Sequence, residues 1–187
     1  MSTIGFAMCG SFCTLSDAME LMKELNKDYS ILPIMSDNTY NTDTRFGTAK
    51  GFIEQAEDIS GKKMIHTIVE AEPIGPKALV DLMLVSPCTG NTLSKIANGI
   101  TDTSVTMAVK SALRIGTPVV LCIATKDALG ASGQNIAKLM NTKNIYFVPV
   151  KQDNPEKKPM SLIADFSFVK DTIKKAVKGE QIQPVFL

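Results

Sequence analysis

The sequence predicts an α/β fold of three layers, in which an open parallel sheet of about five to six strands lies between two layers of helices. Two observations support this fold class. Short apolar runs alternate along the chain with segments whose apolar residues recur at helical spacing. The chain also has 187 residues, of which 44% are hydrophobic, so one domain over residues 1–187 can bury a core.

Five apolar runs predict the strands of this sheet. They cover residues 3–8, 30–35, 79–85, 117–124 and 144–148. The third run is apolar at nearly every position, which is typical of a strand buried on both faces of a parallel sheet. Strands that alternate with helices in this way are typical of Rossmann-like and flavodoxin-like domains.

The segments between the strands predict helices and loops. Apolar residues at positions 15, 18, 19, 21, 22 and 25 predict a first helix over residues 14–25. Further helices are predicted over residues 46–59, 63–71, 93–97, 105–115, 136–140 and 161–177. The polar stretch 36–44 and the stretch 151–160 predict loops, the second a candidate lid on the surface, and residues 180–187 predict an irregular tail.

Composition argues against several classes of protein. The net charge is +1, with 20 basic and 19 acidic residues, so we expect no nucleic-acid or membrane partner. The apolar N-terminus lacks a basic segment and predicts a core strand, not a signal peptide. The four cysteines form no C-x-x-C pair and indicate reduced thiols. We therefore expect a cytoplasmic protein without a metal site.

Ligands of open parallel sheets bind at the carboxyl ends of the strands. Gly10 and Ser11 follow the first strand, and Thr14 opens the next helix. A glycine lets the backbone approach an anion, and the first N–H groups of a helix point toward it. A glycine turn with Thr14 as N-cap and Asp17 as its capping-box partner explains the same residues. Phosphate binding and a plain turn therefore both stay open.

The stretch 86–92, after the third predicted strand, is rich in small polar residues. Their hydroxyl and amide groups offer donors and acceptors to a ligand with a ring or a phosphate, although a well-capped turn is the alternative. Residues 125–133, after the fourth strand, contain two glycines and predict either a ligand contact or a plain connection.

Two nucleotide motifs are absent from the sequence. It contains neither G-x-x-x-x-G-K-[ST] nor G-x-G-x-x-G, so it predicts neither a Walker phosphate loop nor a dinucleotide fingerprint. FMN fits better, because its single phosphate needs only one helix start.

The motifs resemble those of the flavin-containing cysteine-decarboxylase superfamily, whose signature is P-A-[ST]-x-N-T…K-x-A-x-G-x-x-D. The resemblance rests on Gly10-Ser11, SPCTGNT at 86–92 and KIANGITD at 95–102. Cys88 and Gly90 depart from the usual alanines but are also small. Over its full length the chain resembles the family of dipicolinate synthase B subunits. The segments that carry this are NTDTRFG at 41–47, AEPIGP at 71–76, DALG at 127–130, TKNIYF at 142–147 and QDNPEKKP at 152–159.

The resemblance implies bound FMN and a homotrimer or a larger assembly of trimers. It also implies a partner, the dipicolinate synthase A subunit, which would carry NAD(P). The pair would oxidise a dihydrodipicolinate-type precursor, a small dicarboxylate, to dipicolinate in the mother-cell cytoplasm of a sporulating bacterium. The implied cofactor-binding residues are Gly10, Ser11, Thr14, Ser36, Ser86, Pro87, Cys88, Thr89, Asn91 and Thr92.

Substrate and catalytic residues are less constrained by the sequence. A dicarboxylate favours arginine, and Arg45 follows the polar loop after the second strand. Lys157 and Lys158 are further candidates, with a solvated charge pair as the alternative. The catalytic residue is unknown. His66, the only histidine, is a weak candidate whose alternative is an ordinary residue of a helix surface or an interface.

Two other functions stay open on the sequence alone. The first is a free-standing FMN-dependent decarboxylase or flavin-modifying enzyme. The second is a non-catalytic scaffold that has lost flavin binding, an alternative that the altered signature at Cys88 and Gly90 leaves open.

Overall fold

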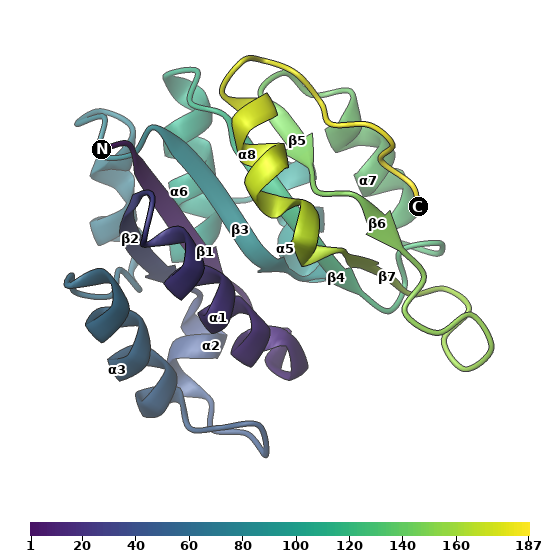
Figure 1. Cartoon of the computed structure of the whole chain (residues 1–187), viewed down its shortest axis with the longest axis horizontal. Coiled ribbons are helices and arrows are strands. Elements are labelled where there is room, and N and C mark those ends of the chain that lie inside the picture. The colour runs from purple at the N-terminus through teal and green to yellow at the C-terminus, as the bar shows by residue number, and fades with distance from the viewer.

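A seven-stranded sheet forms the middle layer of the computed structural model, which describes residues 1–187 (Figure 1). Its strands follow the order β2-β1-β3-β4-β7-β6, and β5 pairs with β4. The parallel strands are β1 (Thr3–Met8), β2 (Ser30–Met35), β3 (Leu82–Cys88), β4 (Val119–Thr125) and β5 (Ile145–Phe147). The predicted α/β fold is confirmed, with two short antiparallel strands added to it.

Helices cover both faces of the sheet. α1 (Leu15–Leu25) and α8 (Val169–Ala176) lie on the face toward the viewer in Figure 1, and α5 (Gly90–Ala97), α6 (Ser104–Arg114) and α7 (Gly133–Met140) lie on the other. β3 is buried at every position, as its apolar composition predicts. None of the helices is long and apolar enough to cross a membrane.

The segment after β2 is more helical than predicted. Residues 36–44, predicted to be a loop, contain α2 (Asp37–Asn41), which starts directly after Ser36. The predicted helix 46–59 is α3 (Ala49–Ser60), because the Thr48 hydroxyl accepts the backbone N–H of Gly51 and sets the N-terminus.

The predicted helix 63–71 is wrong over its first half. Residue Ile65 pairs in parallel with Ile34 beside β2, and α4 (Ile68–Ala71) begins only after a capping box between Thr67 and Glu70. A 3₁₀ turn, η2 (Glu72–Ile74), follows. The hydrogen bonds of the sheet edge therefore override the helical spacing here.

β3 lies three residues later than predicted. It ends at Cys88, which pairs with Ile123 of β4 after a shift in register. Ser86, Pro87 and Cys88 therefore lie in the strand and not in the turn that follows it. The sequence did not show this because serine and proline are poor strand signals.

The predicted helix 161–177 is also wrong at its start. β7 (Leu162–Ala164) pairs antiparallel with the end of β4 and with β6 (Val150–Lys151). A 3₁₀ turn, η3 (Phe166–Phe168), separates β7 from α8. A three-residue apolar run fits a helix as well as a strand, so only the pairing with β4 decides it. Most of the predicted loop 151–160 connects β6 to β7 and projects from the body of the molecule (Figure 1).

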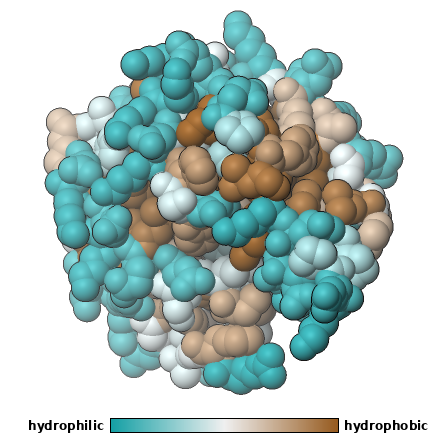
Figure 2. Space-filling view, turned by 45° about the vertical axis from the view of Figure 1, so that its right-hand side comes forward, coloured by the Kyte–Doolittle hydropathy of each residue, from teal (hydrophilic) through white to brown (hydrophobic).

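The tail at 180–187 is irregular, as predicted, but it is held against the sheet. The Gln181 amide accepts the N–H of Phe147 at 2.8 Å and donates to the carbonyl of Phe147 at 2.7 Å. The N–H of Leu187 donates to the carbonyl of Val150 at 2.9 Å. The face turned forward in Figure 2 gathers apolar side chains near its middle and hydrophilic ones around them.

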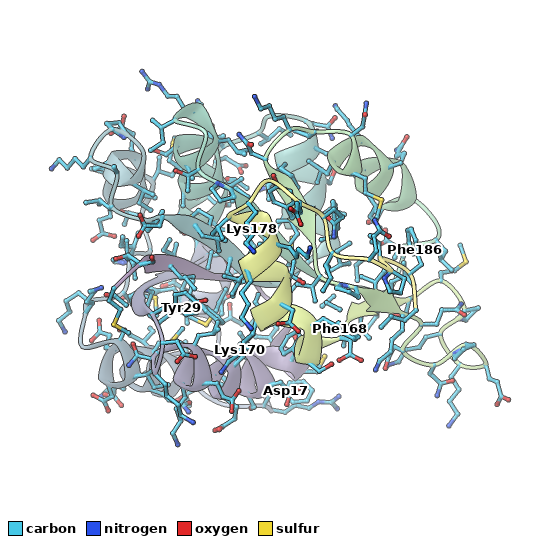
Figure 3. The ribbon with its side chains drawn as sticks, turned by 45° about the horizontal axis from the view of Figure 1, so that its top comes forward. Asp17, Tyr29, Phe168, Lys170, Lys178 and Phe186 are labelled. Atoms are coloured by element: carbon cyan, nitrogen blue, oxygen red, sulfur yellow. The ribbon has the colours of Figure 1, made fainter.

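Charged side chains connect α8 to its neighbours. Lys170 points from α8 toward the end of α1, where its Nζ lies 3.4 Å from Asp28 Oδ2 and 3.8 Å from Glu24 Oε2 (Figure 3). On the other side, Lys151 Nζ donates to Asp165 Oδ2 at 2.6 Å, and the Ser167 hydroxyl donates to Asp165 Oδ1 at 2.7 Å. Asp165 thus joins the β6–β7 hairpin to the start of η3.

The Asp165 contacts predict a pH-dependent contribution to stability. Hydrogen bonds from Lys151 and Ser167 lower the pKa of Asp165 to about 2. A lowered pKa means that the contribution is fully present above the unfolded pKa of about 3.9 and is lost as the pH falls toward about 2. We expect Asp165→Asn to reduce the free energy of unfolding by about 1 kcal/mol above pH ~4, after solvent screening, and by less near pH 2.

Urea unfolding of the two proteins across this pH range measures the effect. Asp58→Asn, at an exposed position of α3, is the matched control. An Asp165→Asn curve that stays parallel to the wild-type curve down to pH 2 would contradict the assignment.

Candidate functional site

A cavity with a volume of about 660 Å³ opens at the carboxyl ends of β1, β3 and β4. Its walls come from residues 10–14 after β1, the start of α5, residues 124–127 at the end of β4, and the segment leading into β7. Arg45 and Phe46 close another side. The volume is within the range of sites that hold small organic ligands.

A second cavity of about 410 Å³ adjoins the first and shares Gly10, Phe12 and Thr89 with it. It extends from these residues to the starts of α2, α5 and α6. Except for Phe12, its lining residues are polar or glycine. They include Ser36, Asp37, Asn38, Asn91, Thr92, Lys95, Asp102 and Thr103.

The turn after β1 leaves one hydroxyl free. Thr14 Oγ1 donates to the carbonyl of Ser11 at 2.8 Å, and Thr14 makes no side-chain cap on α1. The expected capping box between Thr14 and Asp17 is therefore not formed. The Ser11 hydroxyl makes no cap to η1 (Phe12–Thr14) either, and Ser11 lines the larger cavity beside Gly10. Ser11 can thus donate to a ligand.

Helix starts surround the smaller cavity. Ser36 precedes α2, and its hydroxyl shares a 2.9 Å hydrogen bond with Thr39. Thr89 caps α5 by accepting the N–H of Thr92 at 3.3 Å. Asn91 is exposed to the same cavity, and its amide makes no hydrogen bond within the chain. The backbone N–H groups at helix starts favour an anion in this cavity.

An ion pair closes the far end of the smaller cavity. Lys95 Nζ lies 2.8 Å from Asp102 Oδ1 and 3.0 Å from Oδ2. The hydrogen bond from Lys95 lowers the pKa of Asp102, so this carboxylate is ionised at neutral pH.

Ser86, Pro87 and Cys88 are buried in β3 and line neither cavity. Ser86 Oγ is buried without a hydrogen-bond partner among oxygens and nitrogens. Burial raises the pKa of Cys9 to about 11 and that of Cys122 to about 12, and it raises the pKa of Cys88 as well. These three thiols are protonated at neutral pH and therefore cannot act as nucleophilic thiolates.

Two of the three substrate candidates line the same cavity, and the third does not. Arg45 lines the larger cavity and stacks its guanidinium over Phe46, 4.8 Å from the ring centre. Lys158 lines the same cavity from the β6–β7 loop, and its ion pair with Asp153 raises its pKa. Lys157 lines neither cavity. The structure therefore separates two neighbours that the sequence could not distinguish.

His66 also lies outside both cavities. It precedes α4, and its ring stacks on Tyr40 with centroids 3.9 Å apart and planes 11° apart. Its Nδ1 lies 3.3 Å from Glu70 Oε2. The helix-surface alternative is wrong, because residue 66 is not helical; an interface position and a catalytic role for His66 stay predictions.

Asp127 is a cavity residue that sequence reasoning did not single out. Thr125 Oγ1 donates to its Oδ1 at 2.5 Å and Ser132 Oγ donates at 2.9 Å. These two bonds lower the pKa of Asp127. The available signal was an aspartate two residues after a strand that ends in threonine. No group of three or more His, Cys, Asp or Glu residues is placed to hold a metal ion.

Comparisons with known proteins agree on one family. The family model described as Flavoprotein matches residues 1–178. The B subunit of dipicolinate synthase from Bacillus subtilis (strain 168) is 44% identical over 185 residues, which cover 98% of this chain and 92% of that protein.

Solved structures extend this similarity. The crystal structure of the dipicolinate synthase B subunit from Bacillus halodurans has a TM-score of 0.91 and 42% identity, and the match covers 100% of this chain and 96% of that chain. The FMN-dependent cysteine decarboxylase SpaF shares the fold, with a TM-score of 0.71 at 17% identity over 96% of this chain and 97% of that chain.

The burial of the cysteines predicts how many thiols react in the folded protein. Cys13 is exposed in the wall of the larger cavity, whereas Cys9, Cys88 and Cys122 are buried. We expect one thiol per chain to react rapidly with dithionitrobenzoate, and all four in denaturant. Cys13→Ser should abolish the rapid reaction. Rapid labelling of a second thiol in that variant would contradict the assigned burial.

Proposed function

Because the chain belongs to the flavoprotein family, we propose that it binds FMN across the two adjoining cavities and acts as the B subunit of a dipicolinate synthase. The observation that carries the proposal is the geometry of these cavities. A polar cavity surrounded by helix starts opens directly into a larger one at the carboxyl edge of the sheet.

The residues present fit a flavin mononucleotide. The free hydroxyl of Ser11 and the helix starts at Ser36 and Thr89 supply donors for one phosphate and a ribityl chain. Gly10 adds no side chain at the point where the two cavities meet. The larger cavity has room for a planar ring system.

Ser86, Pro87 and Cys88 support the site from below in this proposal. They lie buried in β3, so they fix the position of Thr89 and of α5 instead of contacting the ligand. The side chain of Cys88 is fully buried. Because it is also small, β3 can lie close to the elements that pack on it.

Arg45 and Lys158 are the proposed contacts for a dicarboxylate substrate. They reach the larger cavity from different segments, so they can pair with two separate carboxylates. Arg45 is pre-positioned by its stacking on Phe46. Lys158 exchanges its ion pair with Asp153 for one with the substrate.

The proposed reaction is the oxidation of a dihydrodipicolinate-type precursor to dipicolinate. When bound, FMN supplies two-electron redox chemistry. This chain binds and orients the ligands, and an A subunit supplies the NAD(P) site, which agrees with the lack of a dinucleotide fingerprint here. Co-purification with a dehydrogenase-like A subunit and oxidation only by the pair would support this division. Carbon dioxide release by the isolated chain would favour a decarboxylase instead.

Substitution of two cavity residues tests the flavin site. We expect Ser11→Ala and Asn91→Ala to weaken FMN binding by about 1–3 kcal/mol each, because each removes a donor to the ligand. Fluorescence titration of FMN measures the affinity, and Ser16→Ala, at an exposed position of α1, is the control. A wild-type chain that does not retain FMN would favour the scaffold function.

Two neighbouring lysines provide a matched test of the substrate site. We expect Arg45→Ala and Lys158→Ala to weaken binding of pyridine-2,6-dicarboxylate about tenfold each, which corresponds to about 1.4 kcal/mol for a lost charge-assisted hydrogen bond. Lys157→Ala should change it by less than about twofold, because Lys157 lines neither cavity. Calorimetric titration measures all three. Equal effects at Lys157 and Lys158 would indicate a diffuse charge effect and contradict the site.

A further inference from the structure

The carboxylate of Asp127 is held in one orientation in the wall of the larger cavity. Both hydroxyl donors, from Thr125 and Ser132, bond the same oxygen, Oδ1. Oδ2 receives no hydrogen bond from another residue. The side chain is therefore fixed, and Oδ2 can accept a hydrogen bond from a ligand.

The backbone of α5 makes room for this carboxylate. A Cβ at Gly90 would lie 2.5 Å from Thr125 Oγ1, 2.9 Å from Ser132 Oγ and 3.1 Å from Asp127 Oδ1. The first two distances are too short for any real side chain at this position. The glycine at position 90 therefore has a structural reason: the Asp127 network packs against the first residue of α5.

The cations of the cavity do not neutralise Asp127. Arg45, Lys126 and Lys158 line the same cavity, but Lys158 pairs with Asp153 and Arg45 stacks on Phe46. Asp127 takes part in no ion pair, and hydrogen bonding keeps its pKa below the ordinary value, so it is an acceptor only. The cavity thus offers cationic donors, the carboxylate of Asp153 in an ion pair, and the unpaired carboxylate of Asp127.

We infer that Asp127 Oδ2 accepts a hydrogen bond from a ring N–H of the bound ligand. An anionic ligand without such a donor would be repelled by the carboxylate, whereas a heterocycle with an N–H at one edge satisfies it. Asp127 then orients the ring, with the acidic groups of the ligand directed to the cations of the cavity.

The inference rests on the proposed function, in which two ligands carry the required chemistry. The imide edge of a flavin has an N–H group, and so does the ring of a 1,2- or 1,4-dihydropyridine dicarboxylate. The Asp127 site recognises the shared feature, an N–H donor on a planar ring, and the two sources can be separated by experiment.

Two pairs of probes test the N–H requirement. FMN is compared with 3-methyl-FMN, which lacks the imide N–H, and pyrrole-2,5-dicarboxylate is compared with furan-2,5-dicarboxylate, which has the same planar shape but no ring N–H. We expect the wild-type protein to prefer the N–H member of at least one pair by about tenfold or more. The pair that shows the preference identifies the ligand that Asp127 contacts.

Variants of Asp127 then separate recognition from stability. Asp127→Asn has the same shape, but with Thr125 and Ser132 still bonded to Oδ1 its amide presents donors to the cavity in place of the acceptor. In this variant and in Asp127→Ala the preference should fall below about twofold, whereas Asp58→Asn should keep it. A thermal melt of each variant confirms folding.

Two results would overturn the inference: no preference for the N–H member of either pair in the wild type, or a preference that persists in both Asp127 variants. Failure of the flavin proposal is distinguishable from either result. If FMN does not bind at all, the dicarboxylate pair still tests Asp127; if both ligands bind without an N–H preference, the flavin site stands and the role of Asp127 is wrong.

Discussion

One edge of strand β4 pairs with two different strands, β5 and β7, and the site depends on this arrangement. Val119–Leu121 of β4 pair in parallel with β5, and Ala124 and Thr125 pair antiparallel with β7. Because β5 ends at Phe147, the last part of the edge is free to accept a strand from later in the chain. β7 therefore brings Ser161, Leu162 and Ile163 to the carboxyl end of the sheet, where they form a wall of the larger cavity.

The same pairing gives the cavity its mixture of charges. Ser161 Oγ donates to the carbonyl of Thr125, which fixes the end of the β6–β7 loop beside the end of β4. Lys158 and Asp153 come with this loop, whereas Arg45 comes from the segment between α2 and α3. Charges of both signs thus reach one cavity from distant parts of the chain, and a ligand that carries both acidic groups and a donor suits such a surface.

Sequence reasoning succeeded where one local signal was sufficient. The apolar runs at 3–8 and 30–35 predict β1 and β2 to the residue, since polar residues or turn signals bound each run. It failed where tertiary pairing decides the outcome. The end of β3 contains Ser86 and Pro87, and β7 is only three residues long, so neither carries a strand signal of its own.

The cavity residues Gly10 and Ser11 were identifiable from the turn after β1. Asp127 had only a weak local signal, because its proximity to Gly90 exists only once β3 and β4 lie side by side.

Gln181 has a consequence for the solution behaviour of the chain. β5 is an edge strand, and such edges attract other chains through their free backbone groups. The Gln181 side chain occupies both the N–H and the carbonyl of Phe147, as a neighbouring strand would do. Gln181 therefore blocks the backbone groups of Phe147 from pairing with a strand of another chain. A shortened chain that ends before this glutamine would keep its cavities and still self-associate through β5.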